Sequence, residues 1–387
     1  MATKNAILSG IPIEIEKGGT LKQSFTAYAV ITAGTGSTTA LQSIASVGSS
    51  GQVLTSNGAA LPTFQAAPTV NIVPTVTATA PTVEGEIFYD TATDKYVGYG
   101  LNAGTWAAEN SLNTARRLLG GAGTASSALS FGGFIAAVSA VTESWDGTSW
   151  SAENALNTGR SGIGGCGTAA DALSFGGNGS QTTTERWDGS NWTAKTGLNT
   201  GLPDPGSAGS AADALAFGGV SGPTAHTERW DGSGESWANK ANMNTARGAL
   251  GGADDAATAL SFGGLIGAST SALTERYEGV GDSWVSKSSL NTSRAYLKGS
   301  SSGSSSNTLS FGGGTGGGAA TPSAVTELYD VEGDSWTTRT SMSTARFGIG
   351  GSGDSSSALA FGGSTGSNSA VTESFASTVA EVTFTTT

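Results

Sequence analysis

The triplet Phe-Gly-Gly recurs six times along the chain, at intervals of 42 to 50 residues, and each copy closes a short apolar run such as "ALSFGG". A single unit of this length cannot bury both faces of a small sheet, so such units must pack against one another. The repeat therefore constrains the fold more than any other feature. The copies begin at Phe131, Phe175, Phe217, Phe262, Phe311 and Phe361.

The rest of each unit keeps the same order. Thr-Glu follows the glycines, an aromatic residue lies two positions beyond the Glu, and a Trp comes five or seven residues later. Asn-Thr-x-Arg or a variant then leads into the next unit, except in the third unit, where Leu202 replaces the Arg. In the first two units the repeat positions are Gly132, Gly133, Glu143, Trp145, Trp150, Arg160, Gly176, Gly177, Glu185, Trp187 and Trp192.

Each unit predicts four short strands. The run before the glycines is one strand, "TERWDG" alternates and ends in an Asp-Gly hairpin signal, and the Trp segment returns. "RxxLGGxG" supplies the innermost or next-innermost strand. Units of about 40–50 residues with four strands close into a β-propeller. We therefore predict an all-β fold with a six-bladed propeller over residues 86–387. The paired glycines would allow close backbone approach near the axis, and the tryptophans would fill the wider gaps between blades.

The last unit lacks its second Trp, whereas Trp106 precedes the first unit without a partner. We predict that the strand around Trp106 completes the last unit and closes six blades. In the alternative, the C-terminal "EVTFTTT" pairs there, and "EGEIFYDTATDKYVGY" forms part of a seventh sheet.

The order of apolar run, double glycine, aromatic residue and Trp resembles the kelch repeat, over roughly residues 100–387. The resemblance implies a kelch-like propeller with the double glycine ending the second strand. Trp or Tyr at the first aromatic position, and the tight "WDGxxW" spacing in two units, depart from the kelch pattern.

Residues 1–85 lack the repeat, and "PTVNIVPTVTATAPTVEGE" has a spacing of prolines that indicates extended chain. "ALQSIASVGSSGQVLTSNGAALPTFQ" and "GEIFYDTATDKYVGYGLNAGTW" resemble segments of bacteriophage tail-fibre and other virion appendage proteins. The resemblance implies an extended, β-rich region that attaches to other virion proteins and oligomerises, a trimer being favoured. It places the protein in the virion, after synthesis in the host cytoplasm.

Composition excludes several classes of partner. The net charge is −12, and no basic patch exists for nucleic acid or an anionic membrane. No apolar run approaches the length of a membrane span, and the N-terminus lacks the pattern of an export signal. No phosphate-binding, zinc-binding or nucleophile motif is present, so we expect no cofactor and no metal. The single Cys166 should be a small buried residue.

Repetition argues against catalysis. A copper oxidase of the galactose oxidase type needs two His, but His226 is the only one, and we expect it to be a solvated loop residue. Asp146 and Gly147 are adjacent, which breaks the spacing of the sialidase Asp-box. We expect the repeated Glu and Arg to form partly buried ion pairs. They would otherwise line the channel and bind a cation or glycan, or provide a catalytic carboxylate pair. We therefore predict that the protein is not an enzyme.

The segments between the second and third strands vary in sequence and should gather on one face of the ring. Their Ser, Thr, Gly and Asn suit hydrogen bonding to sugars or to a protein. We predict that this face recognises the host surface through a receptor or glycan, with avidity from copy number. The alternatives are a head or tail decoration or adaptor protein, and a glycan-degrading tailspike. The candidate residues are Phe134, Ser139, Asn178, Gln181, Ser221, His226, Ser269, Ser271, Ser364 and Asn368.

Overall fold

The computed structural model describes residues 52–57, 60–66, 87–90, 95–220, 222, 224–300, 307–316 and 321–383. Strands are the regular elements of these residues, which contain no helix and hence none that could span a membrane. The chain divides into two compact units, Met1–Thr77 and Ala78–Thr387. The all-β prediction is confirmed. The expected boundary after residue 85 stays a prediction.

The first unit contains one described hairpin. Strand β1 (Gln52–Asn57) pairs antiparallel with β2 (Ala60–Ala66), so that Leu54 lies opposite Phe64. This hairpin falls in the phrase that resembles phage fibres. The rest of the expected attachment region lies outside the described residues.

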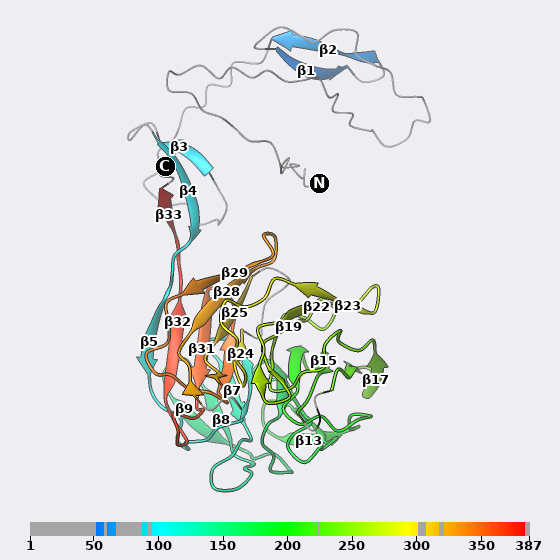
Figure 1. The fold of residues 1–387 in the computed structure, drawn as a ribbon, viewed down its shortest axis with the longest axis vertical. Coiled ribbons are helices and arrows are strands. Elements are labelled where there is room, and N and C mark those ends of the chain that lie inside the picture. The colour runs from blue at the N-terminus through cyan, green and yellow to red at the C-terminus, as the bar shows by residue number, and fades with distance from the viewer. Residues whose placement is uncertain are drawn as a thin grey trace. The chain divides into compact units, whose positions relative to one another are not determined.

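The second unit is a six-bladed β-propeller, as the repeat predicts, and we number the blades in chain order (Figure 1). Blade 1 contains β6 (Gly120–Gly123), β7 (Ala128–Phe131), β8 (Thr142–Trp145) and β9 (Trp150–Glu153). Blade 2 contains β10 (Gly164–Gly167), β11 (Ala172–Phe175), β12 (Thr184–Trp187) and β13 (Trp192–Lys195). Blade 3 contains β14 (Gly206–Gly209), β15 (Asp213–Phe217), β16 (Thr227–Asp231) and β17 (Ser236–Lys240).

Blades 4 and 5 repeat this pattern and carry small additional hairpins. Blade 4 contains β18 (Gly251–Ala253), β19 (Leu260–Phe262), β22 (Thr274–Glu278) and β23 (Ser283–Lys287). Blade 5 contains β24 (Lys298–Gly299), β25 (Thr308–Phe311), β28 (Thr326–Asp330) and β29 (Ser335–Arg339). The loops after β19 and β25 hold the hairpins β20 (Leu265–Ile266) with β21 (Ser269–Thr270) and β26 (Gly314–Thr315) with β27 (Thr321–Pro322).

Blade 6 closes the ring with a strand from the other end of the propeller sequence. It contains β30 (Gly350–Gly353), β31 (Ser357–Phe361), β32 (Thr372–Ala376) and β5 (Thr105–Glu109), which runs beside β32 in Figure 1. Phe375 of β32 lies opposite Trp106 of β5. The predicted closure is therefore confirmed. The glycine-rich first strands of successive blades, from β6 round to β30, are neighbours around the axis and hence innermost.

The alternative closure, in which the C-terminal segment pairs with the last unit, is wrong, because β5 takes that place. Strand β33 (Val379–Thr383) pairs with β4 (Lys95–Leu101), which in turn pairs with β3 (Ile87–Asp90). These strands form a separate three-stranded sheet rather than a seventh blade.

The core lies between blades, which explains why a lone unit would not fold. Six buried apolar clusters each combine side chains of two adjacent blades, one cluster for each interface. At each interface the Trp of the outermost strand meets the Phe of the preceding blade, with ring centroids 4.9–5.4 Å apart. Such a buried aromatic pair adds about 0.5–1.5 kcal/mol to the burial of its area.

The same Trp residues also form hydrogen bonds from blade to blade. Each indole Nε1 donates to the Thr hydroxyl that begins the third strand of the preceding blade, at 3.0–3.2 Å. Trp106 makes this bond to Thr326, so the circuit of six bonds closes on itself. The tryptophans therefore fill the gaps between blades, as the sequence predicts, and they also join the blades by hydrogen bonds.

Candidate functional site

The repeated Glu and Arg are buried parts of the scaffold. In five blades the Arg guanidinium meets the Glu carboxylate at 2.9–3.1 Å, and both side chains are at most 2% exposed. In blade 2, Arg160 also donates to the carbonyl of Gly176 and the hydroxyl of Ser174, and Glu185 accepts from the backbone N–H of Asn157 at 2.7 Å. The pair thus fixes the segment that enters the blade. Burial lowers the pKa of Arg160, and Glu185 opposes that shift.

The double glycine is required by backbone geometry at this same place. Gly132 and Gly133 have φ of 63° and 104°, and Gly176 and Gly177 have φ of 68° and 131°, all in the left-handed region. A Cβ on Gly132 would lie 2.8 Å from the carbonyl oxygen of Arg160. Together with the paired Trp145 and Trp150 and the paired Trp187 and Trp192, the glycines are structural positions of the blade.

Blade 3 lacks the repeated Arg, and a different residue contacts its Glu. Leu202 fills the Arg position and is fully buried, which would leave the carboxylate of Glu228 buried without a cation. His226 takes over, with its Nε2 3.0 Å from Oε1 of Glu228 and 20% of its side chain exposed. The expectation of a solvated loop histidine is therefore wrong. The imidazole is the partner of a buried carboxylate.

The segments between second and third strands lie at one end of the strands, together with the segments that join one blade to the next. We call this end the loop face, formed by the described residues 132–141, 176–183, 218–220, 222, 224–226, 263–273, 312–316, 321–325 and 362–371. The hairpin turns within blades, such as the one that carries Val280, lie at the opposite end. The loops therefore share one face, as their position in the repeat predicts.

The candidate recognition residues differ in how much surface they offer. Ser269 is exposed, and Phe134, Asn178, Gln181, His226 and Asn368 are half-buried. Ser139, Ser271 and Ser364 are buried. Their hydroxyls accept backbone N–H groups two residues further on and hold the loops in shape. Ser221 lies outside the described residues. The sequence analysis did not identify the exposed aliphatic side chains of the same loops, which include Ile135, Val138 and Ile266.

Arg117 links two of the candidate residues, Phe134 of blade 1 and Asn368 of blade 6. The Arg117 guanidinium lies 4.6 Å from the centroid of Phe134 and donates to Oδ1 of Asn368 at 2.8 Å. The Asn368 amide in turn donates to the carbonyl of Ile135 at 2.6 Å. The loops of blades 1 and 6 are thereby joined, and Ile135 and Val138 are held on their exposed side, 39% and 53% accessible.

A closed circuit of backbone hydrogen bonds surrounds the axis at the loop face. Six equivalent residues, one from each blade entry, each donate the N–H to the carbonyl of the previous one at 2.7–3.0 Å. All six have φ between 48° and 63°, although only two are glycines. They are Leu118, Gly162, Asp204, Ala249, Tyr296 and Gly348. Their side chains differ, so the symmetric backbone carries an asymmetric set of groups at the axis.

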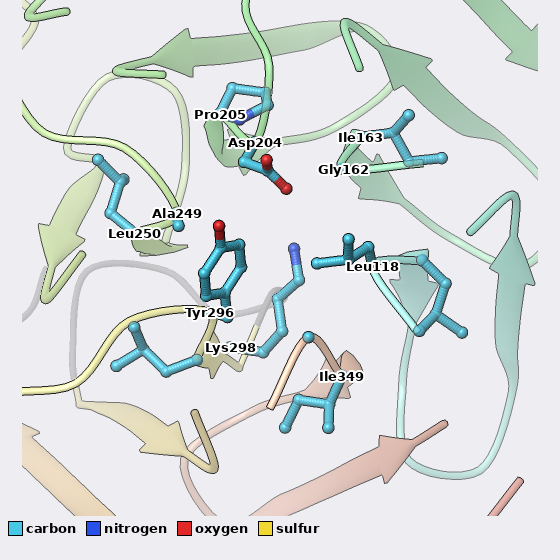
Figure 2. A pocket seen from close by; sticks show the side chains of 13 residues that line it. Leu118, Gly162, Ile163, Asp204, Pro205, Ala249, Leu250, Tyr296, Lys298 and Ile349 are labelled. Atoms are coloured by element: carbon cyan, nitrogen blue, oxygen red, sulfur yellow. The ribbon is translucent and has the colours of Figure 1, made fainter. Parts of the chain in front are cut away.

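Those groups surround a small pocket at the axis (Figure 2). The cavity has a volume of about 30 Å³, and aliphatic side chains such as Leu119, Ile163 and Ile349 line its wall. Figure 2 shows the carboxylate of Asp204 and the amine of Lys298 pointing into the pocket. We call this site the axial pocket. Burial raises the pKa of Asp204 to about 6, and the charge of Lys298 opposes the rise.

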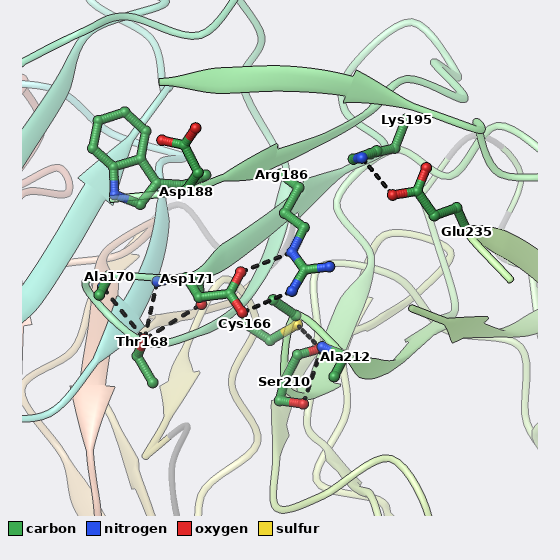
Figure 3. A network of polar contacts seen from close by, with 12 residues as sticks. Cys166, Thr168, Ala170, Asp171, Arg186, Asp188, Lys195, Ser210, Ala212 and Glu235 are labelled. Atoms are coloured by element: carbon green, nitrogen blue, oxygen red, sulfur yellow. Dashed lines mark hydrogen bonds and ion pairs between the residues drawn. The ribbon is translucent and has the colours of Figure 1, made fainter. Parts of the chain in front are cut away.

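A second group of charges lies on the outer flank of blades 2 and 3 (Figure 3). Arg186 makes two bonds of 2.8 Å to Asp171, and Lys195 pairs with Glu235 of the next blade. Arg229 and Asp213 repeat the two-bond pair in blade 3. Because all these side chains are partly exposed, we treat them as surface pairs worth at most about 1 kcal/mol each. The buried Cys166 lies beneath them, and burial raises the pKa of its thiol.

Comparison with known proteins adds no assignment to this geometry. No protein-family model matches the chain, and no curated protein is similar to it in sequence. Within the described residues, no group of three or more His, Cys, Asp or Glu is placed to hold a metal ion. The six-bladed propeller is what the structure shows of the resemblance to kelch proteins.

Proposed function

We propose that this protein is a non-enzymatic structural protein of a phage virion, a fibre-like appendage whose kelch-like propeller recognises the host surface. Its N-terminal region would attach it to other virion proteins and oligomerise it, a trimer being favoured. The two phrases that resemble phage fibres support the setting. The loop face supports host recognition, and it is the observation on which the proposal rests.

The loop face combines a rigid base with variable segments. Each loop leaves a double glycine, which the buried Arg holds in blade 2. In blade 3 the loop is held at its end, where His226 contacts Glu228 of the following strand. A loop can therefore change its outer residues without disturbing the blade beneath it. Rigid scaffolds that present variable loops commonly bind ligands with those loops. Several copies on one particle would strengthen an individually weak contact.

The exposed aliphatic groups of blade 1 give a direct test. The full chain carrying both Ile135→Ser and Val138→Ser should adsorb several-fold less to cells of the bacterium that supports the virus, because these side chains are 39% and 53% accessible on the loop face. The measurement is binding of fluorescently labelled protein to cells, with the melting temperature checked in parallel. Val280→Ser is the matched control, since Val280 is fully exposed at the opposite end of the blades.

Other outcomes would favour the alternative functions, an adaptor protein or a glycan-degrading enzyme. Absence of adsorption by the unchanged chain, together with attachment of its loop face to another virion protein, would replace receptor binding with an adaptor role. Release of polysaccharide fragments by the purified chain would contradict the non-enzymatic proposal. Locating the chain in intact particles with a specific antibody tests the virion setting itself.

A further inference from the structure

Lys298 departs from the repeat at a position where the repeat has a steric reason for glycine. In the other five blades a glycine stands there, and a Cβ on it would lie 2.2–2.3 Å from the Phe ring of the same blade. These glycines are Gly120, Gly164, Gly206, Gly251 and Gly350. Blade 5 carries Lys298 instead, and its first strand β24 has only two residues, whereas four of the other first strands have four. Packing alone does not account for this lysine.

Asp204 is the only acidic residue among the six equivalent positions of the backbone circuit. It has φ of 48°, in the left-handed region that all six positions share and that two of its equivalents, Gly162 and Gly348, fill with glycine. Its carboxylate lies against Gly162, since a Cβ there would be 2.4 Å from Oδ1 of Asp204. The side chain of Asn178 approaches the same point, with Oδ1 2.7 Å from that Cβ.

Lys298 and Asp204 thus place one cation and one anion in the axial pocket. Among the described residues, neither the Lys298 amine nor the Asp204 carboxylate has a hydrogen bond or an ion pair within 4.0 Å. Burial lowers the pKa of Lys298, and Asp204 opposes that shift. Both side chains are half-buried, and charges that are partly removed from water reduce stability unless each finds a hydrogen-bonding partner. Residues that break local rules at such a cost are expected at functional sites.

The chemistry of the pocket selects among ligands. Its charges sum to zero, so a strongly anionic or cationic group would be attracted by one side chain and repelled by the other. A secondary amide carries an N–H for the carboxylate and, beside it, a carbonyl oxygen for the ammonium. The aliphatic wall suits a methyl group next to that carbonyl. The cavity of about 30 Å³ admits a small substituent but not a whole sugar ring.

We propose that the axial pocket binds the acetamido group of an N-acetylated sugar, with Lys298 donating to its carbonyl oxygen and Asp204 accepting from its N–H. The sugar ring would stay outside on the loop face, next to Tyr296 and Leu118, which are only half-buried. This proposal rests on the proposed function and names the class of host glycan that the loop face would recognise.

The test compares three sugars on the full chain. Saturation-transfer NMR should give the strongest signal on the methyl group of N-acetylglucosamine, with little signal for glucosamine or glucose. Lys298→Gly and Asp204→Gly should each weaken N-acetylglucosamine binding at least tenfold, because each removes one of the two bonds. Both variants restore a glycine that other blades already use, so they should fold, and their melting temperatures verify this. Lys195→Ala on the outer flank is the control and should bind normally.

The outcomes separate this inference from the proposed function. Equal signals from glucose and N-acetylglucosamine, or unchanged binding by Lys298→Gly, would overturn the acetamido assignment and leave a pocket that holds water between the two charges. If the unchanged chain adsorbs to cells and Lys298→Gly adsorbs equally well, the inference fails while host recognition stands. If the unchanged chain does not adsorb but binds N-acetylglucosamine through Lys298, the pocket stands and host recognition fails.

Discussion

At the scale of single residues, blade 3 shows which part of the repeat is indispensable. Its Glu228 keeps the backbone bonds of the other blades, accepting from the N–H groups of Asn199 and Thr200 at 2.7 and 2.8 Å. Only the side-chain partner of the carboxylate has changed, from a guanidinium on the entering segment to the imidazole of His226. Loss of a hydrogen bond to a charged group typically costs about 1.5–3 kcal/mol. The carboxylate is therefore constant, and the identity of its side-chain partner is exchangeable.

The replacement of the repeated Arg by His226 can be tested by restoring the Arg of the other blades. His226→Val should lower the free energy of unfolding by about 1.5–3 kcal/mol, because the buried Glu228 carboxylate would lose its side-chain hydrogen bond. Adding Leu202→Arg, the residue of the other blades, should recover most of the loss. Chemical denaturation of the single and double variants measures both effects. A cost below about 0.5 kcal/mol for His226→Val would show that the imidazole does not support Glu228.

At the scale of the elements, the repeat predicted the strands well because each strand has a local pattern. The "FGG" and "TERW" phrases mark the second and third strands, and the unpaired Trp106 marked β5 as the closing strand. The hairpin β20–β21 was not predicted, because its two-residue strands carry no alternation. The axial pocket was not predicted either, because Asp204 and Lys298 lie in different blades and only the completed ring brings them together. Lys298 in place of glycine was the one signal in the sequence.

The closing strand β5 should contribute as much to the stability of the propeller as the outermost strand of any other blade. Trp106 packs 5.4 Å from Phe311 and donates to Thr326, just as Trp192 packs 4.9 Å from Phe131 and donates to Thr142. Trp106→Ala and Trp192→Ala should therefore each cost about 3–5 kcal/mol of unfolding free energy, a value typical of a large buried aromatic. Denaturant unfolding compares the two variants. A far smaller loss for Trp106→Ala would mean that β5 does not hold the ring shut.

At the scale of the whole molecule, the ring is held by two circuits that each run through all six blades. The inner one is the backbone circuit at the axis, and the outer one is the set of Trp–Thr bonds. An open array of repeats can fray from its ends, whereas a closed ring has no terminal repeat. Opening one interface breaks both circuits and exposes an apolar cluster. The propeller should therefore unfold as one unit in spite of its repetition.

Chemical labelling of the single cysteine measures whether the propeller unfolds as one unit. Cys166 is 1% exposed in the cluster between blades 2 and 3, and burial raises the pKa of its thiol, so it should react with a thiol reagent only after that interface opens. Labelling of Cys166 and the fluorescence of the tryptophans, which lie in every blade, should show the same denaturant midpoint in the unchanged chain. In Trp106→Ala the ring is weakened at the interface of blades 5 and 6, and both midpoints should fall together. Labelling of Cys166 well before the fluorescence change would mean that blades open one at a time, because an interface far from the closing strand would then be lost on its own.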